Sequence, residues 1–175
     1  MHYSLCLKHT DKEWIFIDGS HIRAHQHSAG LKDQSISKSI GGNSSKLHLA
    51  VDSHGNPIEI IIMNGTTHDV KVAPELVEKL DLEETDVLCA DKGYDSEPLR
   101  EQISATNTKA NIPLKPNTQS NNNHIDWNLY KIRHLVENTF ARLKQFRGIA
   151  TRYDKLKRNY ENALALASIY IWLPL

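Results

Sequence analysis

The sequence predicts a single α/β domain with a mixed β-sheet flanked by helices. A chain of 175 residues with 39% hydrophobic and 24% charged positions has room for one core of ordinary size. Short β-rich runs alternate with segments of helical periodicity, in the order strand, hairpin, helix, strand, helix, strand, helix, helix. We place this domain at residues 14–175 and take residues 1–13 as an N-terminal arm or the remnant of an upstream region.

The first half contains three predicted strands. Residues 13–18 (EWIFID) form a short apolar run that ends at an Asp-Gly pair, which is typical of a turn. Residues 21–45 are polar and rich in His, Ser, Gly and Gln, which predicts a long loop. Residues 46–52 and 57–63 are β-rich runs joined by SHGN, the pattern of an antiparallel hairpin.

The following stretch alternates helices and strands. Residues 72–82 carry apolar side chains at helical intervals, and residues 86–91 form a buried run that ends in an acid. Residues 96–105 predict a helix with Ser96 at its N-cap, and residues 110–114 predict a short strand. Such alternation indicates a sheet that contains parallel strands.

The C-terminal part is predicted to be helical. Residues 126–146 place apolar side chains on one face and form the longest predicted helix. A basic stretch covers residues 147–159, and an apolar helix follows at residues 161–173. The apolar run at the C-terminus is far shorter than the roughly 20 residues that cross a membrane, and no signal peptide is evident, so we predict no membrane partner.

Charge is balanced overall but segregated along the chain. The 21 basic and 21 acidic residues exclude a uniformly basic nucleic-acid coat and a highly charged disordered chain. Residues 70–105 hold ten acidic and four basic residues, whereas residues 126–175 hold nine basic and four acidic ones. Cys6 and Cys89 are too few for a disulfide framework, which indicates a reducing compartment, the cytoplasm by default.

Two predicted strands end in an aspartate that is followed closely by glycine. These are Asp18 and Asp91, and reactive groups often collect at the ends of strands in open α/β sheets. Turn chemistry alone explains many such pairs, and Asp52 is the clear example because it closes a tight hairpin. Asp18 and Asp91 are instead followed by long excursions of the chain, which leaves both a turn and a functional role open.

A polar stripe lies on the long predicted helix. At about 100° per residue, Tyr130, Arg133, Glu137 and Lys144 share an arc of roughly 60°. The simplest interpretation is a solvated face with Arg133 and Glu137 as an i,i+4 ion pair. If Glu137 instead meets the two strand-end aspartates, three carboxylates form an all-oxygen site suited to Mg²⁺ or Mn²⁺.

Such a site suits a phosphodiester substrate. Two divalent ions held about 4 Å apart can activate a water or a 3′-hydroxyl and stabilise the leaving oxygen. Cations on the same helix face and in the basic stretch would contact the flanking phosphates. The candidate phosphate-binding cations are Arg133, Lys144, Arg147, Arg152 and Lys155.

The sequence resembles the DDE transposases of bacterial insertion sequences, in the insertion-sequence-five branch. The resemblance rests on the Y-x2-R-x3-E-x6-K signature, which residues 130–144 match at every spacing. It also rests on DGSHIRAHQHSAG, GGNSSKLHLAVD, ADKGYDS and RLKQFRGIATRYDK. It implies an RNase H-like fold in which Asp18, Asp91 and Glu137 are the catalytic and metal-binding residues. It also implies that Tyr130, Arg133 and Lys144 are DNA-binding residues that contact the transposon end.

The resemblance further implies a metal-dependent enzyme that cuts DNA at transposon ends and joins the 3′-hydroxyl to target DNA. The cofactor would be two Mg²⁺ or Mn²⁺ ions, and the protein would act as a homo-oligomer on DNA, associated with the bacterial nucleoid. Such transposases usually carry an upstream region that recognises the transposon end. Only 17 residues precede Asp18, so we expect an upstream region supplied by frameshifting or lost by truncation.

Several alternatives stay open. The chain could be a catalytically silent fragment that binds DNA or regulates transposition, or a host nuclease that cuts without joining. The cluster of His21, His25 and His27 allows zinc binding, although a DNA-facing or merely polar loop explains it better. Asp69 and Asp95 have structural explanations as acids near turns and helix starts.

Overall fold

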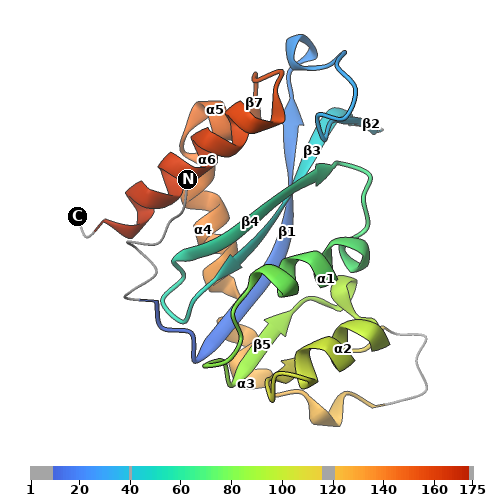
Figure 1. Cartoon of the computed structure of the whole chain (residues 1–175), viewed down its shortest axis with the longest axis vertical. Helices are drawn as coiled ribbons and strands as arrows, with labels where there is room; N and C mark the ends of the chain where they lie inside the picture. Colours follow the sequence, from blue (N-terminus) through green and yellow to red (C-terminus); the bar gives the residue numbers. More distant parts are fainter. Residues whose placement is uncertain (1–9, 40, 116–120, 174–175) are drawn as a thin grey trace.

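The protein is one mixed β-sheet covered by helices on both faces, as a computed structural model shows (Figure 1). The structure describes residues 10–39, 41–115 and 121–173. Within these ranges seven strands join into a single sheet. The predicted α/β class with a mixed sheet is therefore confirmed.

Three long antiparallel strands form one half of the sheet. β1 (Trp14–Ala24) pairs with β3 (Gly42–Val51), which pairs on its other side with β4 (Pro57–Asn64). The predicted hairpin between the last two is confirmed. Asp52 is buried in its turn, where its Oδ1 accepts the N–H groups of His54 (3.0 Å) and Asn56 (2.8 Å). The turn interpretation of this aspartate therefore holds.

Parallel strands form the other half. β5 (Val87–Ala90) pairs with the first residues of β1, and β6 (Lys109–Asn111) pairs with β5. β7 (Thr151–Arg152) pairs in parallel with the opposite end of β1, and β2 (Ser37–Ser39) pairs antiparallel with the start of β3. β1 is thus the central strand on which the other pairings depend.

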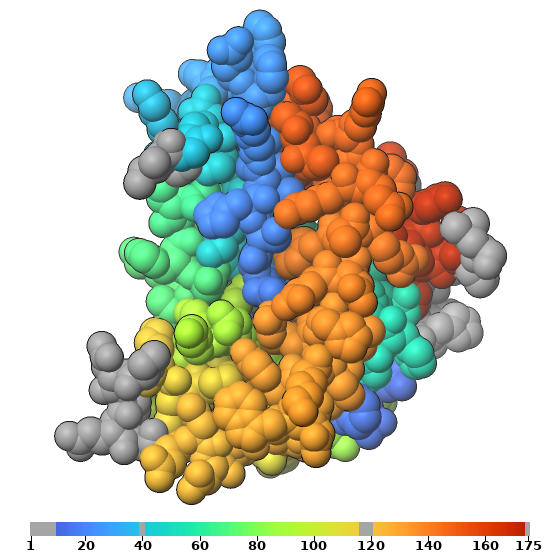
Figure 2. Space-filling model, turned by 180° about the vertical axis from the view of Figure 1, so that it is seen from behind, coloured from blue at the N-terminus to red at the C-terminus, as the bar shows by residue number. Residues whose placement is uncertain are grey.

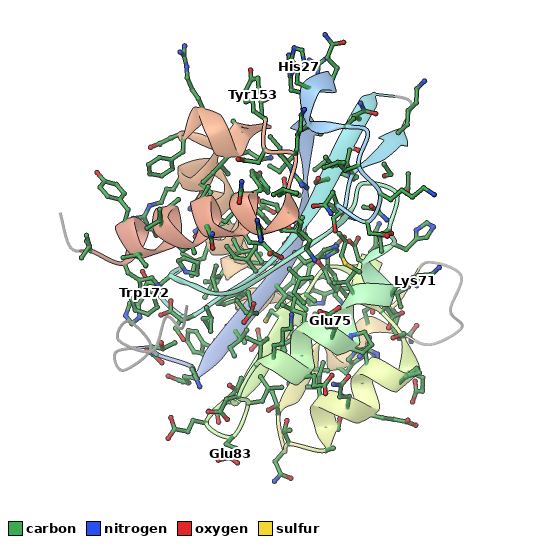
Figure 3. The ribbon with its side chains drawn as sticks, turned by 45° about the horizontal axis from the view of Figure 1, so that its top comes forward. His27, Lys71, Glu75, Glu83, Tyr153 and Trp172 are labelled. Carbon is green, nitrogen blue, oxygen red and sulfur yellow. The ribbon has the colours of Figure 1, made fainter. Side chains whose placement is uncertain are left out.

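Two helices cover one face. α1 (Asp69–Lys79) and α2 (Glu97–Ser104) bury their apolar sides against Ile15 and Ile17 of β1. The polar side chains of Lys71 and Glu75 on α1 point away from the sheet (Figure 3). The amphipathic pattern of both segments therefore gives the predicted helices, with α1 displaced toward the N-terminus.

The remaining helices cover the other face, against Phe16 and Ile22 of β1. Alternation along β1 separates the two cores, because successive side chains of a strand point to opposite faces. At the end of α6, the Trp172 indole donates a hydrogen bond to the carbonyl of Pro57 (2.9 Å). The helices of this face are α3 (Trp127–Ile132), α4 (His134–Lys144), α5 (Arg147–Ala150) and α6 (Lys157–Trp172).

The predicted loop over residues 21–45 is wrong at both ends. β1 continues to Ala24 and β3 begins at Gly42, because every residue from Phe16 to Arg23 has a partner on β3. The side chains there are polar, so the sequence shows no strand pattern. The pairing is imposed by the partner strand, which composition cannot reveal.

The long helix predicted over residues 126–146 is divided at Arg133. The Arg133 N–H bonds to the carbonyl of Tyr130, and the Val136 N–H bonds to the carbonyl of Arg133, both at 3.1 Å. These i→i+3 bonds form a tight 3₁₀-type turn between α3 and α4. The basic stretch 147–159 is also ordered, since it forms α5, β7 and the start of α6.

Arg152 is fully buried, which argues against its predicted contact with DNA. Its guanidinium donates hydrogen bonds to Ser45 Oγ (3.0 Å) and to the carbonyl of Asp154 (3.1 Å), and lies over the Tyr160 ring. Burial lowers the pKa of Arg152, as expected for a charge removed from water. The residue therefore holds β7 against β3 and α6.

We expect Arg152→Ala to lower the free energy of unfolding by about 2–4 kcal/mol, because it creates a cavity and removes two buried hydrogen bonds. The exposed Lys155→Ala should stay within about 0.5 kcal/mol of the wild type. Urea unfolding measures both. Equal midpoints for the two variants would contradict the structural role of Arg152.

Candidate functional site

Parallel pairing brings the two strand-end aspartates side by side. β1 and β5 are in register with Ile17 opposite Ala90, so Asp18 and Asp91 are the next residues on adjacent strands. Both side chains are partly exposed, both carboxylates contribute to raising the pKa of Tyr94, and Asp91 also contributes to raising that of Asp18. The sheet register therefore builds the first half of the site.

β1 has an open edge beside these aspartates. β5 pairs with β1 only as far as Ile17 and β7 only from Arg23, so no strand among the described residues pairs with residues 18–22 on that side. Figure 2 shows this part of β1 running beside the residues of α3 and α4. The third carboxylate, Glu137, comes from the first turn of α4.

Arg133 joins the strand to the helix. Its Nη1 donates to Asp18 Oδ2 (2.7 Å) and its Nη2 to Glu137 Oε1 (2.8 Å). The arginine and aspartate side chains are 17% and 22% exposed, whereas that of Glu137 is 55% exposed. The i,i+4 pair of the simplest interpretation exists, but the same guanidinium also connects two of the three candidate carboxylates.

Tyr130 reaches the remaining carboxylate. Its hydroxyl donates to Asp91 Oδ1 (3.2 Å). The start of α3 is fixed by Asn111, the last residue of β6, which exchanges two hydrogen bonds with the backbone of Asp126 (2.9 and 3.0 Å). Asp126 in turn caps the helix by accepting the N–H of Leu129 (3.0 Å). The sheet edge thus sets where Tyr130 lies.

Lys144 completes the stripe at the other end of α4. Its Nζ donates to Ser20 Oγ (2.7 Å), two residues along β1 from Asp18. A cavity of about 280 Å³ lies between strand and helix, lined by Asp18, Ser20, Glu137 and Lys144 among others. All four residues of the predicted stripe therefore face the sheet, despite the break in the helix.

The ionisation of the site follows from burial and from its internal charges. Burial raises the pKa of Asp18, and Asp91 adds to this, while Arg133 and the Gly19 N–H oppose the shift without cancelling it. Burial alone would lower the pKa of Arg133, but its carboxylate partners raise it overall. Burial and Asp91 also raise the pKa of Tyr130, so its hydroxyl remains a donor.

The donor set fits a hard divalent cation. Asp18, Asp91 and Glu137 offer only oxygens, and the repulsion between the two aspartates would be relieved by a bound positive charge. In the conformation observed, Arg133 supplies that charge. Across the described part of the chain, no three acidic, histidine or cysteine side chains lie close enough together to hold a metal ion.

A polar network that the sequence analysis did not predict lies on the opposite face of the sheet. Asp69 Oδ1 pairs with Lys46 Nζ (2.5 Å) and lies 3.6 Å from His48 Nδ1, which shares a hydrogen bond with Tyr94 Oη (2.9 Å). A Cβ on either Gly19 or Gly93 would lie 3.0 Å from an Asp69 carboxylate oxygen.

This network supports the site from beneath. Burial lowers the pKa of His48 to about 4, so the ring is neutral, and burial raises the pKa of Tyr94 well above its ordinary range. Asp69 packs against Gly19, directly after Asp18, and against Gly93, two residues after Asp91. Asp69 is distant in sequence from both Gly19 and Gly93, so the sequence pattern could not predict this contact.

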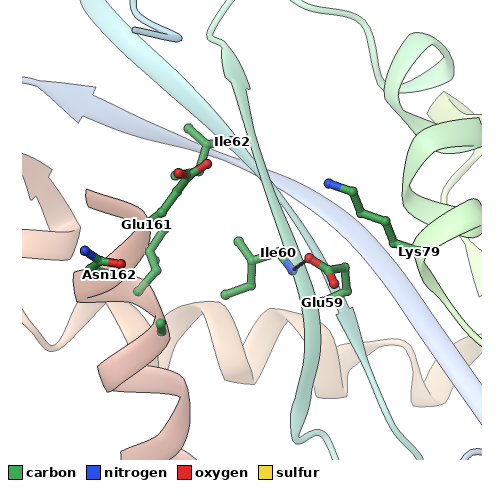
Figure 4. A pocket seen from close by; sticks show the side chains of 8 residues that line it. Glu59, Ile60, Ile62, Lys79, Glu161 and Asn162 are labelled. Carbon is green, nitrogen blue, oxygen red and sulfur yellow. Dashed lines mark hydrogen bonds between the residues drawn. The ribbon is translucent and has the colours of Figure 1, made fainter. Parts of the chain in front are cut away.

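The other candidates lie apart. Asp95 pairs with Arg100 (2.8 Å), an ion pair that the sequence analysis did not predict and that gives this acid a structural role. Arg147 and Lys155 are exposed beyond the end of α4. A further cavity of about 310 Å³ lies beside β4 (Figure 4). Its lining includes Glu59 of β4, Lys79 of α1 and Glu161 of α6. It contains none of the predicted site residues.

Comparison with known proteins identifies the family. Residues 9–172 match the model of the transposase DDE domain. The chain belongs to the DDE transposases of insertion sequences. It is 39% identical over 129 residues to a transposase of insertion sequence element IS6501 from Brucella ovis, an alignment that covers 73% of this chain and 97% of that protein.

Solved structures show the same fold at low sequence identity. A chain of the simian T-cell lymphotropic virus intasome, solved with PP2A regulatory subunit B56 gamma, matches with a TM-score of 0.55 and 14% identity over 93% of this transposase. The piggyBac transposase synaptic complex with hairpin DNA matches with a TM-score of 0.53 and 13% identity over 93%. The transposase spans 49% and 46% of those chains, and its fold is RNase H-like.

The described part of the transposase contains no helix with the length and apolarity needed to cross a membrane. Cys89 is buried and is a free thiol, and burial raises the pKa of this thiol to about 11. Cys6 and the proposed N-terminal arm up to residue 9 lie outside the described residues.

The raised pKa of Asp18 makes a prediction about stability. The folded state binds this proton more tightly than the unfolded state, so the group favours folding more as the pH falls. The stability of the wild type relative to Asp18→Asn should therefore increase between pH 7 and pH 4. Urea unfolding of both proteins at each pH tests this, since the other titrating groups cancel in the difference. A difference that is flat or falls with acidification would contradict it.

Proposed function

We propose that this transposase domain cleaves DNA phosphodiester bonds at transposon ends and transfers the 3′-hydroxyl to target DNA. The observation that carries the proposal is the placement of Asp18 and Asp91 at adjacent strand ends, with Arg133 bonded to both Asp18 and Glu137 of α4. Family membership supplies the reaction class. The low-identity neighbours support DNA as the partner, since the piggyBac structure contains it.

The three carboxylates would hold Mg²⁺ or Mn²⁺, and two ions are expected. When bound, such cations supply an activated water or 3′-hydroxyl and stabilise the leaving oxygen. Because oxygen ligands are the only donors offered, thiolate-preferring metals are disfavoured. Tyr130 fixes the orientation of the Asp91 carboxylate by donating to its Oδ1.

The cations of α3 and α4 have separate roles. Arg133 balances Asp18 and Glu137, so its positive charge is already offset by two carboxylates. Lys144 lines the cavity that also contains Asp18, and its Nζ donates to the neutral hydroxyl of Ser20. Among the described residues it forms no ion pair, so its charge is available to DNA. Arg147 and Lys155 would contact DNA farther from the reacting phosphate.

Substrate choice and assembly belong to the proposal as well. We infer a homo-oligomer on DNA, an upstream region that recognises the transposon end, and association with the bacterial nucleoid. The second candidate function is a DNA-binding fragment without activity. The Glu137 side chain is 55% exposed. This exposure favours the second candidate, because activity requires Glu137 to move toward Asp91 when DNA binds.

Cleavage of supercoiled plasmid and joining of an end-bearing oligonucleotide test the function with Mg²⁺ or Mn²⁺. Asp91→Asn and Glu137→Gln should each lower product formation by about 100-fold or more, because each removes a metal-binding oxygen. Glu97→Gln, an exposed acid on α2, is the matched control and should retain activity. DNA binding without product from the wild type would establish the silent fragment, and cutting without joining would establish a nuclease.

A further inference from the structure

Three aromatic rings stack at the end of β1 remote from Asp91. The His25 ring lies 4.9 Å from that of His27 and 4.8 Å from that of Tyr153, with interplanar angles of 27° and 29°. Figure 3 shows His27 and Tyr153 together at this end of the molecule. The 3₁₀ turn η2 (Gln26–Ser28) carries the second histidine, and the tyrosine directly follows β7.

The stack is held by fixed backbone. The His25 N–H donates to the carbonyl of Arg152 (2.8 Å), and the His25 Nδ1 accepts the N–H of His27 (3.3 Å). Arg152 is itself buried and hydrogen-bonded to Ser45. The rings are therefore placed before any ligand arrives, which reduces the entropy lost on binding.

The rings of Tyr153 and His27 are exposed to solvent and do not pack in the hydrophobic core. Tyr153 is 56% exposed, and His27 is exposed as well. A cavity of about 490 Å³ adjoins the stack, and its lining includes Arg23 and Asn43 but no acidic residue. Within the described residues, Arg23 takes part in none of the ion pairs. An aromatic face, a cation and an amide thus meet in one place.

Successive residues of β1 connect this cavity to the carboxylates. Residues 18–20 line the cavity that contains Asp18 and Glu137, residues 21–23 line the next, and residues 23–25 line the one beside the stack. At about 3.3 Å per residue, Asp18 and His25 are roughly 23 Å apart along the strand. That length corresponds to about seven nucleotide steps of duplex DNA.

We propose that His25, His27 and Tyr153 form a platform that binds an unpaired nucleotide of the DNA substrate. Its base stacks on the Tyr153 end of the rings, and its phosphate pairs with Arg23. This inference rests on the proposed function, because it takes DNA as the substrate. A paired base cannot stack on a side chain without leaving the duplex, so the platform selects single-stranded or extruded nucleotides.

The chemistry of the cluster favours this ligand over the alternatives. A zinc site needs more ligands than the two neighbouring histidines, and the described residues hold no group of three suitable side chains. We therefore assign His25 and His27 of this cluster to DNA contact.

The test measures binding of the full chain to fluorescein-labelled oligothymidylate without divalent metal, with a fully paired duplex as the second probe. Tyr153→Ala should weaken binding to the single strand by about 5- to 100-fold, the range for loss of one stacked base. Binding to the paired duplex should change far less. Tyr153→Phe keeps the ring and should bind within about twofold of the wild type.

A matched control is Tyr170→Ala, which removes an exposed tyrosine on α6 that packs against Phe146. It should leave oligothymidylate binding unchanged. A 2-aminopurine in place of one thymidine should lose fluorescence on binding to the wild type and not to Tyr153→Ala, because stacking quenches it. Equal affinity of Tyr153→Ala and the wild type would overturn the platform, as would equal losses in Tyr153→Phe and Tyr153→Ala.

The two proposals fail separately. Plasmid cleavage that needs Asp91, together with normal oligothymidylate binding by Tyr153→Ala, would remove the platform and leave the proposed function intact. Absence of binding to both DNA probes by the wild type would overturn both.

Discussion

A single guanidinium organises the candidate site of this transposase. Arg133 bonds to Asp18 on β1 and to Glu137 on α4, at 2.7 and 2.8 Å. Without a cation between them, two carboxylates brought this close in a partly buried site would repel each other. The tight turn that divides α3 from α4 also lies at Arg133. The same residue therefore sets the break between the helices and balances the two carboxylates.

The sheet supplies the other constraint. Parallel pairing of β1 with β5 places Asp18 beside Asp91, and the unpaired stretch between β5 and β7 leaves room for α4 to cross the strand. Beneath the sheet, Asp69 packs against both Gly19 and Gly93, where any larger residue would meet its carboxylate. The sheet face toward α4 thus carries the candidate site, and the opposite face packs against the strand ends that hold it.

Much of this could be predicted from local patterns. The short apolar runs predicted β5 and the hairpin, and helical spacing placed Tyr130, Arg133, Glu137 and Lys144 on one face. The extension of β1 and β3 could not be predicted, because polar strands form there only through pairing with each other. Two further features depend on contacts between residues distant in sequence, namely the burial of Arg152 and the position of Asp69. Composition also could not separate a basic residue that faces DNA from one that anchors a strand.

The central proposal is that Asp18, Asp91 and Glu137 would hold a divalent cation at the place where Arg133 now balances Asp18 and Glu137. Calorimetric titration of Mn²⁺ into the wild type, Asp91→Asn and Arg133→Gln tests it most directly. The account predicts binding by the wild type, loss of binding in Asp91→Asn, and tighter binding in Arg133→Gln, where the competing cation is gone. Identical isotherms for the wild type and Asp91→Asn would contradict it.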